Sequence, residues 1–354
     1  MSQSSIAFDL PVWNGIKESP HSKIATLRIN ETQIEGLFKQ KAKRLIRYED
    51  NYVHMTPLKG SKYVDNLRKG KIDWILSYGS YFENILEIGG GDSSNREYIQ
   101  HKTYTIVDPA LEQCENSESL RLINEYVERV DFDISYDAIL MLSVLEHVDS
   151  AETVTEKVAT ILRSDGCIFV VIPIVDRQFA IGDFNALVHE HMYYFTLGGA
   201  VRLFENYGLE IASYHMRNDA GYFKLKRSMG GIRNNAIRYE FPLEHARMSF
   251  DIQLEKFFNI LKSDERILFY GATNGLNNLF HLSRQQIDID YEKFRVTDSD
   301  PSKWDKYLSS HPLPILPSDR TADYKTICIS ALSFYDEIIN RLDQDKVIIS
   351  IGSL

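Results

Sequence analysis

At 354 residues, the chain exceeds the usual size of a single hydrophobic core, so two domains are expected. Hydrophobic residues make up 44% of the chain and charged residues 25%, a globular composition that argues against predominant disorder. The formal net charge of −10 argues against a protein whose main task is to bind nucleic acid, because Lys and Arg neutralise the phosphate backbone.

The three cysteines, Cys114, Cys167 and Cys328, lie far apart and form no C-x-x-C pair. Neither a disulfide framework nor a cysteine zinc site is therefore expected, and a reducing, cytoplasmic location fits best. The amino-terminal segment "MSQSSIAFDLPVW" lacks the basic region and apolar stretch of an export signal. The longest apolar run, "CIFVVIPIV", is short and contains Pro173, so no membrane anchoring is expected.

Residues 1–60 are expected to form a separate amino-terminal element, whose clearest part is "ETQIEGLFKQKAKRLIRYED". Thr32 and Glu35 have the spacing of a capping box. Apolar residues recur at helical intervals, at Ile34, Leu37, Phe38, Ala42 and Leu45. This pattern predicts a helix over residues 33–47, with the basic run "KQKAKR" on its solvated face.

Strand and helix patterns alternate over residues 61–215, and "AETVTEKVATILRS" is the clearest helix. The predicted strands are "NILEIGG", "YTIVDPA", "YDAILMLSV" and "GCIFVVIPI". Their apolar runs are continuous, which indicates burial on both faces and hence a parallel sheet covered by helices. The sequence therefore predicts a doubly wound, Rossmann-like α/β domain.

A polar, glycine-containing link, "MGGIRNNAIRYEF", and a helix, "LEHARMSFDIQLEKFFNILKS", are predicted within residues 216–262. A second, smaller α/β series follows over residues 263–354, with strands in "RILFYG", "KFRVTDSD", "TICISAL" and "KVIISIG". The chain is thus expected to contain two halves that resemble nucleotide-binding folds.

The glycine turn "LEIGGGD" follows the first predicted strand of the larger half. Gly89 and Gly91 fit the first two positions of a dinucleotide fingerprint, but Ser94 occupies the third and weakens that interpretation. Glu87 precedes the turn, and Asp108 ends the next strand about 20 residues on, where this fold places a carboxylate on ribose hydroxyls. An adenosine-containing ligand fits these residues.

Residues 84–175 resemble a class I S-adenosylmethionine-dependent methyltransferase in "LEIGGGD", "IVDPA", "YDAILMLSVLEHV" and "GCIFVVIPI". The resemblance implies S-adenosyl-L-methionine as cofactor and S-adenosyl-L-homocysteine as product. Glu87 and the backbone of Gly89, Gly90 and Gly91 would hold the methionine end. Asp108 would accept the ribose hydroxyls, Asp131 or Phe132 would lie by the adenine, and Glu146 would lie near the cofactor.

The segment "HEHMYYFTLGGAVRLFENYGLE" resembles bacterial sugar C-methyltransferases, which also carry a carboxy-terminal α/β domain. The resemblance implies a small-molecule acceptor that is a sugar or nucleotide sugar, hence a role in carbohydrate biosynthesis, with methylation of carbon next to a keto group. Such chemistry needs a positioned base to remove the acidified C–H proton. By this resemblance His191 is the general base and Glu190 its neighbour.

Three departures from that family keep transfer to an oxygen open. Members of that family usually begin with a cysteine zinc module, whereas no cysteine precedes Cys114 here. Val188 stands where the family commonly has a tyrosine, and "NDAGYFKL" replaces the family's substrate segment. A metal is not expected, because the successive side chains of His189, Glu190 and His191 point apart and no cysteine completes a site.

Two other classes of function remain as alternatives. A non-catalytic assembly subunit that binds S-adenosylmethionine would keep the same methyltransferase-like fold. A dehydrogenase would use the turn "GATNGLNN" to bind a dinucleotide. However, Gly271 and Gly275 are four residues apart where the dinucleotide fingerprint has two, and the spacing to Asp298 fits that fingerprint poorly. This half is therefore interpreted as a structural or substrate-covering domain. The oligomeric state stays open.

Overall fold

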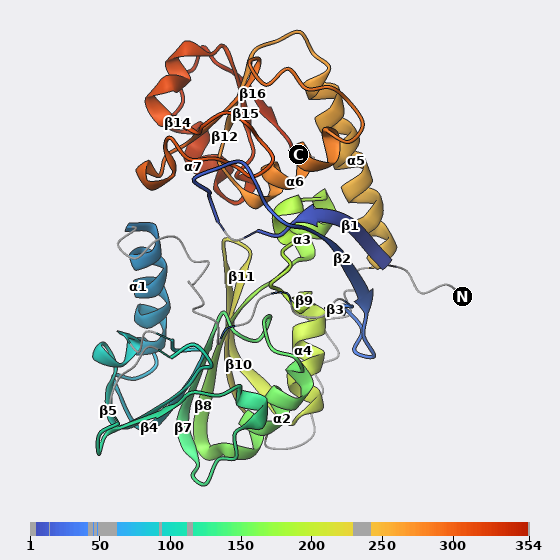
Figure 1. The fold of residues 1–354 in the computed structure, drawn as a ribbon. Coiled ribbons are helices and arrows are strands. Elements are labelled where there is room, and N and C mark those ends of the chain that lie inside the picture. Colours follow the sequence, from blue (N-terminus) through green and yellow to red (C-terminus); the bar gives the residue numbers. More distant parts are fainter. Residues whose placement is uncertain are drawn as a thin grey trace.

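The structure is a computed structural model that describes residues 5–13, 15–41, 45, 48, 62–91, 94–111, 116–228 and 242–352. The described part contains a seven-stranded, a five-stranded and a four-stranded sheet. Figure 1 shows the seven-stranded sheet at one end of the molecule and the five-stranded sheet at the other. Cys114, the predicted link 229–241 and part of the predicted helix 33–47 lie outside the described residues.

The seven-stranded sheet contains every strand predicted for the larger half. Its order is β10-β11-β8-β7-β4-β5-β6, and β4 to β8 run parallel while β11 runs antiparallel to β8 and β10 antiparallel to β11. The strands are β4 (Tyr81–Ile88), β5 (Gln100–Val107), β6 (Leu120–Ile123), β7 (Tyr136–Leu142), β8 (Leu162–Pro173), β10 (Leu209–Arg217) and β11 (Ala220–Arg227).

Helices cover both faces of this sheet, as the continuous apolar strands predict. Ile85 packs into a core with α1 (Lys62–Leu76), whereas Leu86 packs into a core with α2 (Ala151–Ile161) and α4 (Leu197–Asn206). The predicted helix 151–164 is shorter than expected, because β8 begins at Leu162. The strand order reverses between β4 and β7, and ligands of such sheets bind beyond the carboxyl ends of the strands at that point.

The amino-terminal segment is a β-sheet and not the predicted helix. The strands β1 (Ser5–Pro11), β2 (Ile24–Glu31) and β3 (Leu37–Gln40) pair antiparallel, and β3 pairs with β9 (Tyr193–Phe195). The Thr32 hydroxyl accepts a hydrogen bond from the Ile34 backbone amide, and therefore closes a turn where the sequence suggested a helix cap. Phe38 pairs with Tyr194 across the strands, so a partner distant in sequence outweighed the local helical spacing.

The carboxy-terminal sheet is parallel, with the order β14-β13-β12-β15-β16. Its strands are β12 (Ile267–Tyr270), β13 (Phe294–Asp298), β14 (Leu316–Pro317), β15 (Thr326–Ile329) and β16 (Val347–Ser350), and its helices are α6 (Asn274–Ser283) and α7 (Tyr335–Ile339). The strands predicted for this half are thereby confirmed, and so is the helix that precedes them, α5 (Leu243–Leu261).

One hydrophobic core joins the amino-terminal strands to the carboxy-terminal half. Leu27 of β2, Phe250 of α5 and Phe269 of β12 belong to it, together with Phe179 of α3 (Asp176–Ile181). Figure 1 shows β1 and β2 beside α3 and α5, between the two larger sheets. The amino-terminal strands thus connect the two halves, and the boundaries at 61, 216 and 263 stay predictions. None of the described helices has an apolar stretch long enough to cross a membrane.

Candidate active site

A cavity of about 530 Å³ opens where the strand order reverses, a volume typical of a small-molecule site. One group of lining residues ends or follows β4, β5 and β7, and includes Gly89, Asp108 and Ser143. A second group consists of Val188, Glu190 and His191, together with Asn218 and Asp219 of the β10–β11 turn and Ala220 at the start of β11. The cavity is also lined by Trp13 from the amino-terminal part of the chain and by Ser333 from the carboxy-terminal part.

The glycine turn is shaped by the absence of side chains. Gly89 has a φ of +78°, and a Cβ atom there would overlap the Val144 side chain. A Cβ atom at Gly90 would lie 2.9 Å from the Glu87 carboxylate. The backbone can therefore pass close to a ligand at Gly89, which lines the cavity.

Glu87 and Asp108 have different places beside this turn. Glu87 is 2% exposed, and its carboxylate accepts hydrogen bonds from Asn95 Nδ2 at 2.6 Å and from the Tyr104 hydroxyl at 2.8 Å. Asp108 lines the cavity, where its carboxylate accepts from the amides of Gly91 at 2.9 Å and Ala110 at 2.7 Å. Glu87, Gly90 and Gly91 lie behind the wall that Gly89 and Asp108 form.

The two residues predicted for the adenine side, Asp131 and Phe132, do not line the cavity, and their role stays a prediction. Asp131 is exposed and Phe132 packs edge-to-face on Tyr136 at 6.0 Å, and neither lines the cavity. Instead, the cavity is lined by Tyr126, Val127 and Glu128, which follow β6. Sequence patterns missed these residues because β6 has only four residues, too few to carry a periodic signal.

Four titratable side chains that line the cavity lie close together. His147 Nε2 lies 3.7 Å from Glu146 Oε1, and His147 Nδ1 lies 3.2 Å from the Glu190 carbonyl oxygen. The His191 ring lies 4.9 Å from the His147 ring and is tilted 77° to it. The predicted residues Glu146, Glu190 and His191 are therefore brought together.

Burial sets the charges of this cluster. Glu146 is 2% exposed and Oε2 has no hydrogen-bond partner among the described residues, so burial raises the pKa of its carboxyl despite the opposing attraction of His147. Burial, and next the proximity of His147, lowers the pKa of His191 well below its usual range. His191 is therefore a neutral imidazole near neutral pH, the form that can accept a proton.

The segment with His191 is held by the amino-terminal sheet. Gln40 donates its backbone amide to the Met192 carbonyl at 2.8 Å. His189 makes a 2.9 Å hydrogen bond to the Ala25 carbonyl and points away from the cavity, as the divergence of successive side chains predicts. Tyr193, Tyr194 and Phe195 are fully packed in β9.

Within the part of the chain that the structure describes, the three side chains that could share a metal ion are not the His-Glu-His series. Glu146, His147 and His191 each offer a ligand atom, and these atoms lie within 4.8 Å of one another. Within this set, the His147 ring forms a hydrogen bond with the Glu190 carbonyl oxygen. That the site works without a metal stays a prediction.

The carboxy-terminal glycine turn is filled by a side chain of the larger half. The backbone amide of Gly275, at the start of α6, donates to Asn185 Oδ1 at 2.7 Å, and Asn274 Nδ2 donates to the Leu187 carbonyl at 2.9 Å. A Cβ atom at Gly275 would lie 2.7 Å from Asn185. The place where a dinucleotide phosphate would bind is therefore occupied.

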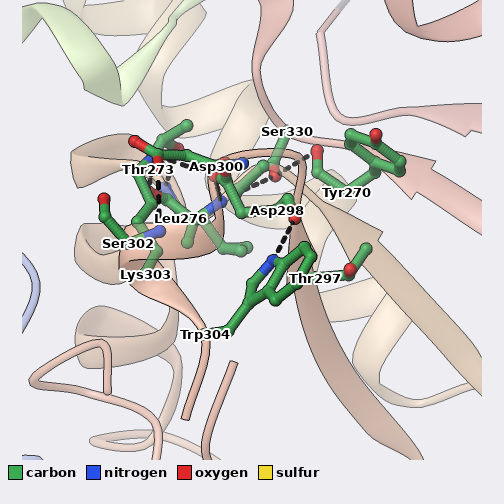
Figure 2. A network of polar contacts seen from close by, with 12 residues as sticks. Tyr270, Thr273, Leu276, Thr297, Asp298, Asp300, Ser302, Lys303, Trp304 and Ser330 are labelled. Atoms are coloured by element: carbon green, nitrogen blue, oxygen red, sulfur yellow. Dashed lines mark hydrogen bonds and ion pairs between the residues drawn. The ribbon is translucent and has the colours of Figure 1, made fainter. Parts of the chain in front are cut away.

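Asp298, the acid that follows this turn, is also engaged within the protein. Its carboxylate accepts from the Ala272 amide at 2.8 Å and from Lys303 Nζ at 2.8 Å. Figure 2 shows the Trp304 indole donating to the Asp298 carbonyl, a bond of 2.8 Å, beside the cap that Thr273 gives α6. These contacts favour the interpretation of this half as a structural unit.

Residues 61–214 match the family model of a methyltransferase domain. The chain is also 33% identical over 69 residues to a curated protein, C-methyltransferase NovU of Streptomyces niveus. That alignment covers 20% of the chain and 16% of the relative. Residues 61–214 therefore carry a class I S-adenosylmethionine-dependent methyltransferase domain.

Two solved structures similar to the chain contain S-adenosylhomocysteine. The first is 1,6-didemethyltoxoflavin-N1-methyltransferase of Burkholderia thailandensis, with 16% identity, a TM-score of 0.39 and coverage of 47% of the chain and 80% of that protein. The second is N-methyltransferase NodS of Bradyrhizobium japonicum, with 12% identity, a TM-score of 0.39 and coverage of 51% and 93%. The assignment of the domain rests on the family model.

Proposed function

We propose that the whole chain is an S-adenosyl-L-methionine-dependent methyltransferase that methylates a sugar-like small molecule. The observation that carries this proposal is a single cavity that is lined both by the Gly89 turn with Asp108 and by His191. The residues of the first group fit the methyl donor, because the turn has no side chain in the way and Asp108 offers a carboxylate to ribose hydroxyls. Bound there, S-adenosyl-L-methionine supplies an electrophilic methyl group.

The residues of the second lining group suit removal of a proton from the acceptor. His191 is neutral, and Glu190 lies beside it on the same cavity wall. In the favoured reaction, His191 takes the proton from carbon next to a keto group. The carbon–methyl bond then forms as the sulfur–methyl bond breaks, leaving S-adenosyl-L-homocysteine and a protonated His191.

Methylation of a hydroxyl is the alternative, because His191 can equally take a proton from oxygen. The replacement of a family substrate segment by "NDAGYFKL" keeps this alternative open, since Asn218, Asp219 and Ala220 of that segment line the cavity. The two reactions need the same residues and differ in the product.

Native mass spectrometry and calorimetry test the donor, and product analysis tests the acceptor. The full chain is expected to bind S-adenosyl-L-homocysteine, and absence of binding at millimolar ligand would contradict the proposal. Labelled methyl donor is then offered with keto-sugars and glycan extracts, and NMR of the product distinguishes a C-methyl from an O-methyl group. Binding without any transfer would favour a non-catalytic assembly subunit.

A further inference from the structure

A lysine of α1 forms a hydrogen bond with a residue of the donor end of the cavity, which is defined as the lining residues that end or follow β4, β5, β6 and β7. Lys71 Nζ donates a hydrogen bond to Ser143 Oγ at 2.9 Å, and Ser143 lines the cavity just after β7. Ser143 has a φ of +68°, a rare conformation for a residue with a side chain. This turn holds its hydroxyl within reach of the Lys71 ammonium.

The charges that act on Lys71 are mainly acidic. Glu146 and Glu87 favour its ammonium form, and the Arg68 cation opposes them. The charged residues of the donor end that line the cavity are Asp108, Glu128 and Glu146. No Lys or Arg lies among the described residues that line the cavity. A carboxylate placed at this end would be repelled unless a nearby cation bound it.

Lys71 has unused capacity to bind an anion. An ammonium group has three hydrogen-bond donors, and the bond to Ser143 is its one hydrogen bond within the described residues. Other cations of the described residues that contact lining residues are already engaged. Arg177 forms a bidentate pair with Asp219, and Lys157 donates to three backbone carbonyls. Arg129, which lies over the Tyr126 ring, is paired with Glu125.

We propose that Lys71 binds the α-carboxylate of the methionine part of the methyl donor. This assignment rests on the proposed function, since it requires the donor to bind at the Gly89 turn. The carboxylates of Glu87 and Glu146, which act on Lys71, would attract the α-ammonium of the same amino-acid group. Burial lowers the pKa of Lys71, and a bound carboxylate would oppose that effect as Glu146 does.

The test compares two ligands that differ by the group Lys71 recognises. S-Adenosyl-L-homocysteine carries the amino-acid group, whereas 5′-methylthioadenosine lacks it and keeps the adenosine. Calorimetry on the full chain is expected to show that Lys71→Met weakens the first ligand roughly 10- to 100-fold, because a charged hydrogen bond is lost. The affinity for 5′-methylthioadenosine should stay within about two-fold, since neither its ribose nor its adenine meets Lys71.

Lys69→Met is the matched control, because Lys69 is exposed on the same helix two positions away and its replacement removes the same charge. Lys71→Arg should restore part of the lost affinity, and binding of 5′-methylthioadenosine reports that each variant is folded. Equal weakening of both ligands, or no weakening of either, would overturn the assignment of Lys71. Failure of the wild-type chain to bind either ligand would overturn the proposed function itself.

Discussion

The imidazoles of His147 and His191 lie 4.9 Å apart, nearly perpendicular, although one follows β7 and the other precedes β9. Burial and this neighbour together hold the pKa of His191 well below its usual range. The pair therefore keeps His191 unprotonated over the pH range in which an ordinary histidine becomes charged, near pH 6.5.

The first prediction follows from that low pKa. The rate of methyl transfer should stay level as pH falls through about 6.5 and decline only at lower pH, where His191 gains a proton. Replacing His147 by Phe removes one cause of the low pKa and should move the acid limb to higher pH. His245→Gln, at an exposed position on α5, is the control for a lost histidine. An unchanged pH–rate profile in His147→Phe would contradict the coupling.

The second prediction concerns the glycine turn. Gly89→Ala should weaken binding of S-adenosyl-L-homocysteine about 10-fold or more, because its methyl group must displace Val144 from the cavity wall. Gly208 has a similar φ of +71°, and no atom lies within 4 Å of the place a Cβ would take, so Gly208→Ala carries the backbone strain without the clash. Calorimetry should show wild-type affinity for Gly208→Ala, and equal losses in both variants would mean that strain alone matters.

The third prediction separates the two candidate acids of the adenosine site. Asp108→Asn should weaken S-adenosyl-L-homocysteine roughly 10-fold, because the carboxylate that lines the cavity loses its charge. Asp131→Asn should leave the affinity unchanged, since Asp131 is exposed and does not line the cavity. The reverse pattern in calorimetric titrations would restore the assignment made from the sequence.

The fourth prediction concerns the contact between the halves. Asn185→Ala leaves the Gly275 amide without its acceptor and should lower the free energy of unfolding by about 1–3 kcal/mol. The rate of methyl transfer should also fall, since Asn185 precedes the segment that carries His191. Asn66→Ala, at an exposed position of α1, is the control. Unchanged urea unfolding and rate would show that this contact is dispensable.

The fifth prediction concerns Asp183, whose carboxyl is 3% exposed and has Oδ2 without a hydrogen-bond partner among the described residues. Burial raises its pKa to about 6, so the folded state holds its proton more tightly than the unfolded state does. Stability from this group is therefore present at low pH and is lost as pH rises from about 4 to about 6, by roughly 3 kcal/mol at most.

Asp183→Asn should consequently be more stable than the wild type at pH 7.5, with a smaller difference at pH 4.5. Urea unfolding at the two pH values measures this. Asp165→Asn, at an exposed position, should show no such pH-dependent gain. A gain of the same size at both pH values would contradict the raised pKa.

Local sequence patterns were sufficient to predict the strands that are buried on both faces, because such strands have a continuous apolar run. The stretch around Leu86 and Ile139 predicted parallel strands, and both residues lie in the core of the seven-stranded sheet. The same argument found the strands of the carboxy-terminal half. The position of Asp108 at the end of its strand was likewise predicted from the sequence, because this fold places an acid about 20 residues after the start of the glycine turn.

Local patterns failed where a partner distant in sequence decided the conformation. Phe38 has helical spacing from its neighbours but pairs with Tyr194, so the segment is a strand. Tyr126 was not predicted to line the cavity, because it follows a strand of only four residues. Lys71 was not predicted as a candidate, because the sequence of its helix does not indicate that it hydrogen-bonds the distant Ser143 hydroxyl.

The parallel sheet, the glycine turn and the acid that follows the second strand could be predicted from local patterns, because each depends on residues close together in the chain. Which side chains face the cavity, and which charges they carry, depends instead on how distant segments pack. His147 meets His191, and Asn185 enters the turn at Gly275, through contacts between segments that no spacing rule connects. The pKa of a group such as His191 follows from its burial, which exists only once those segments have packed.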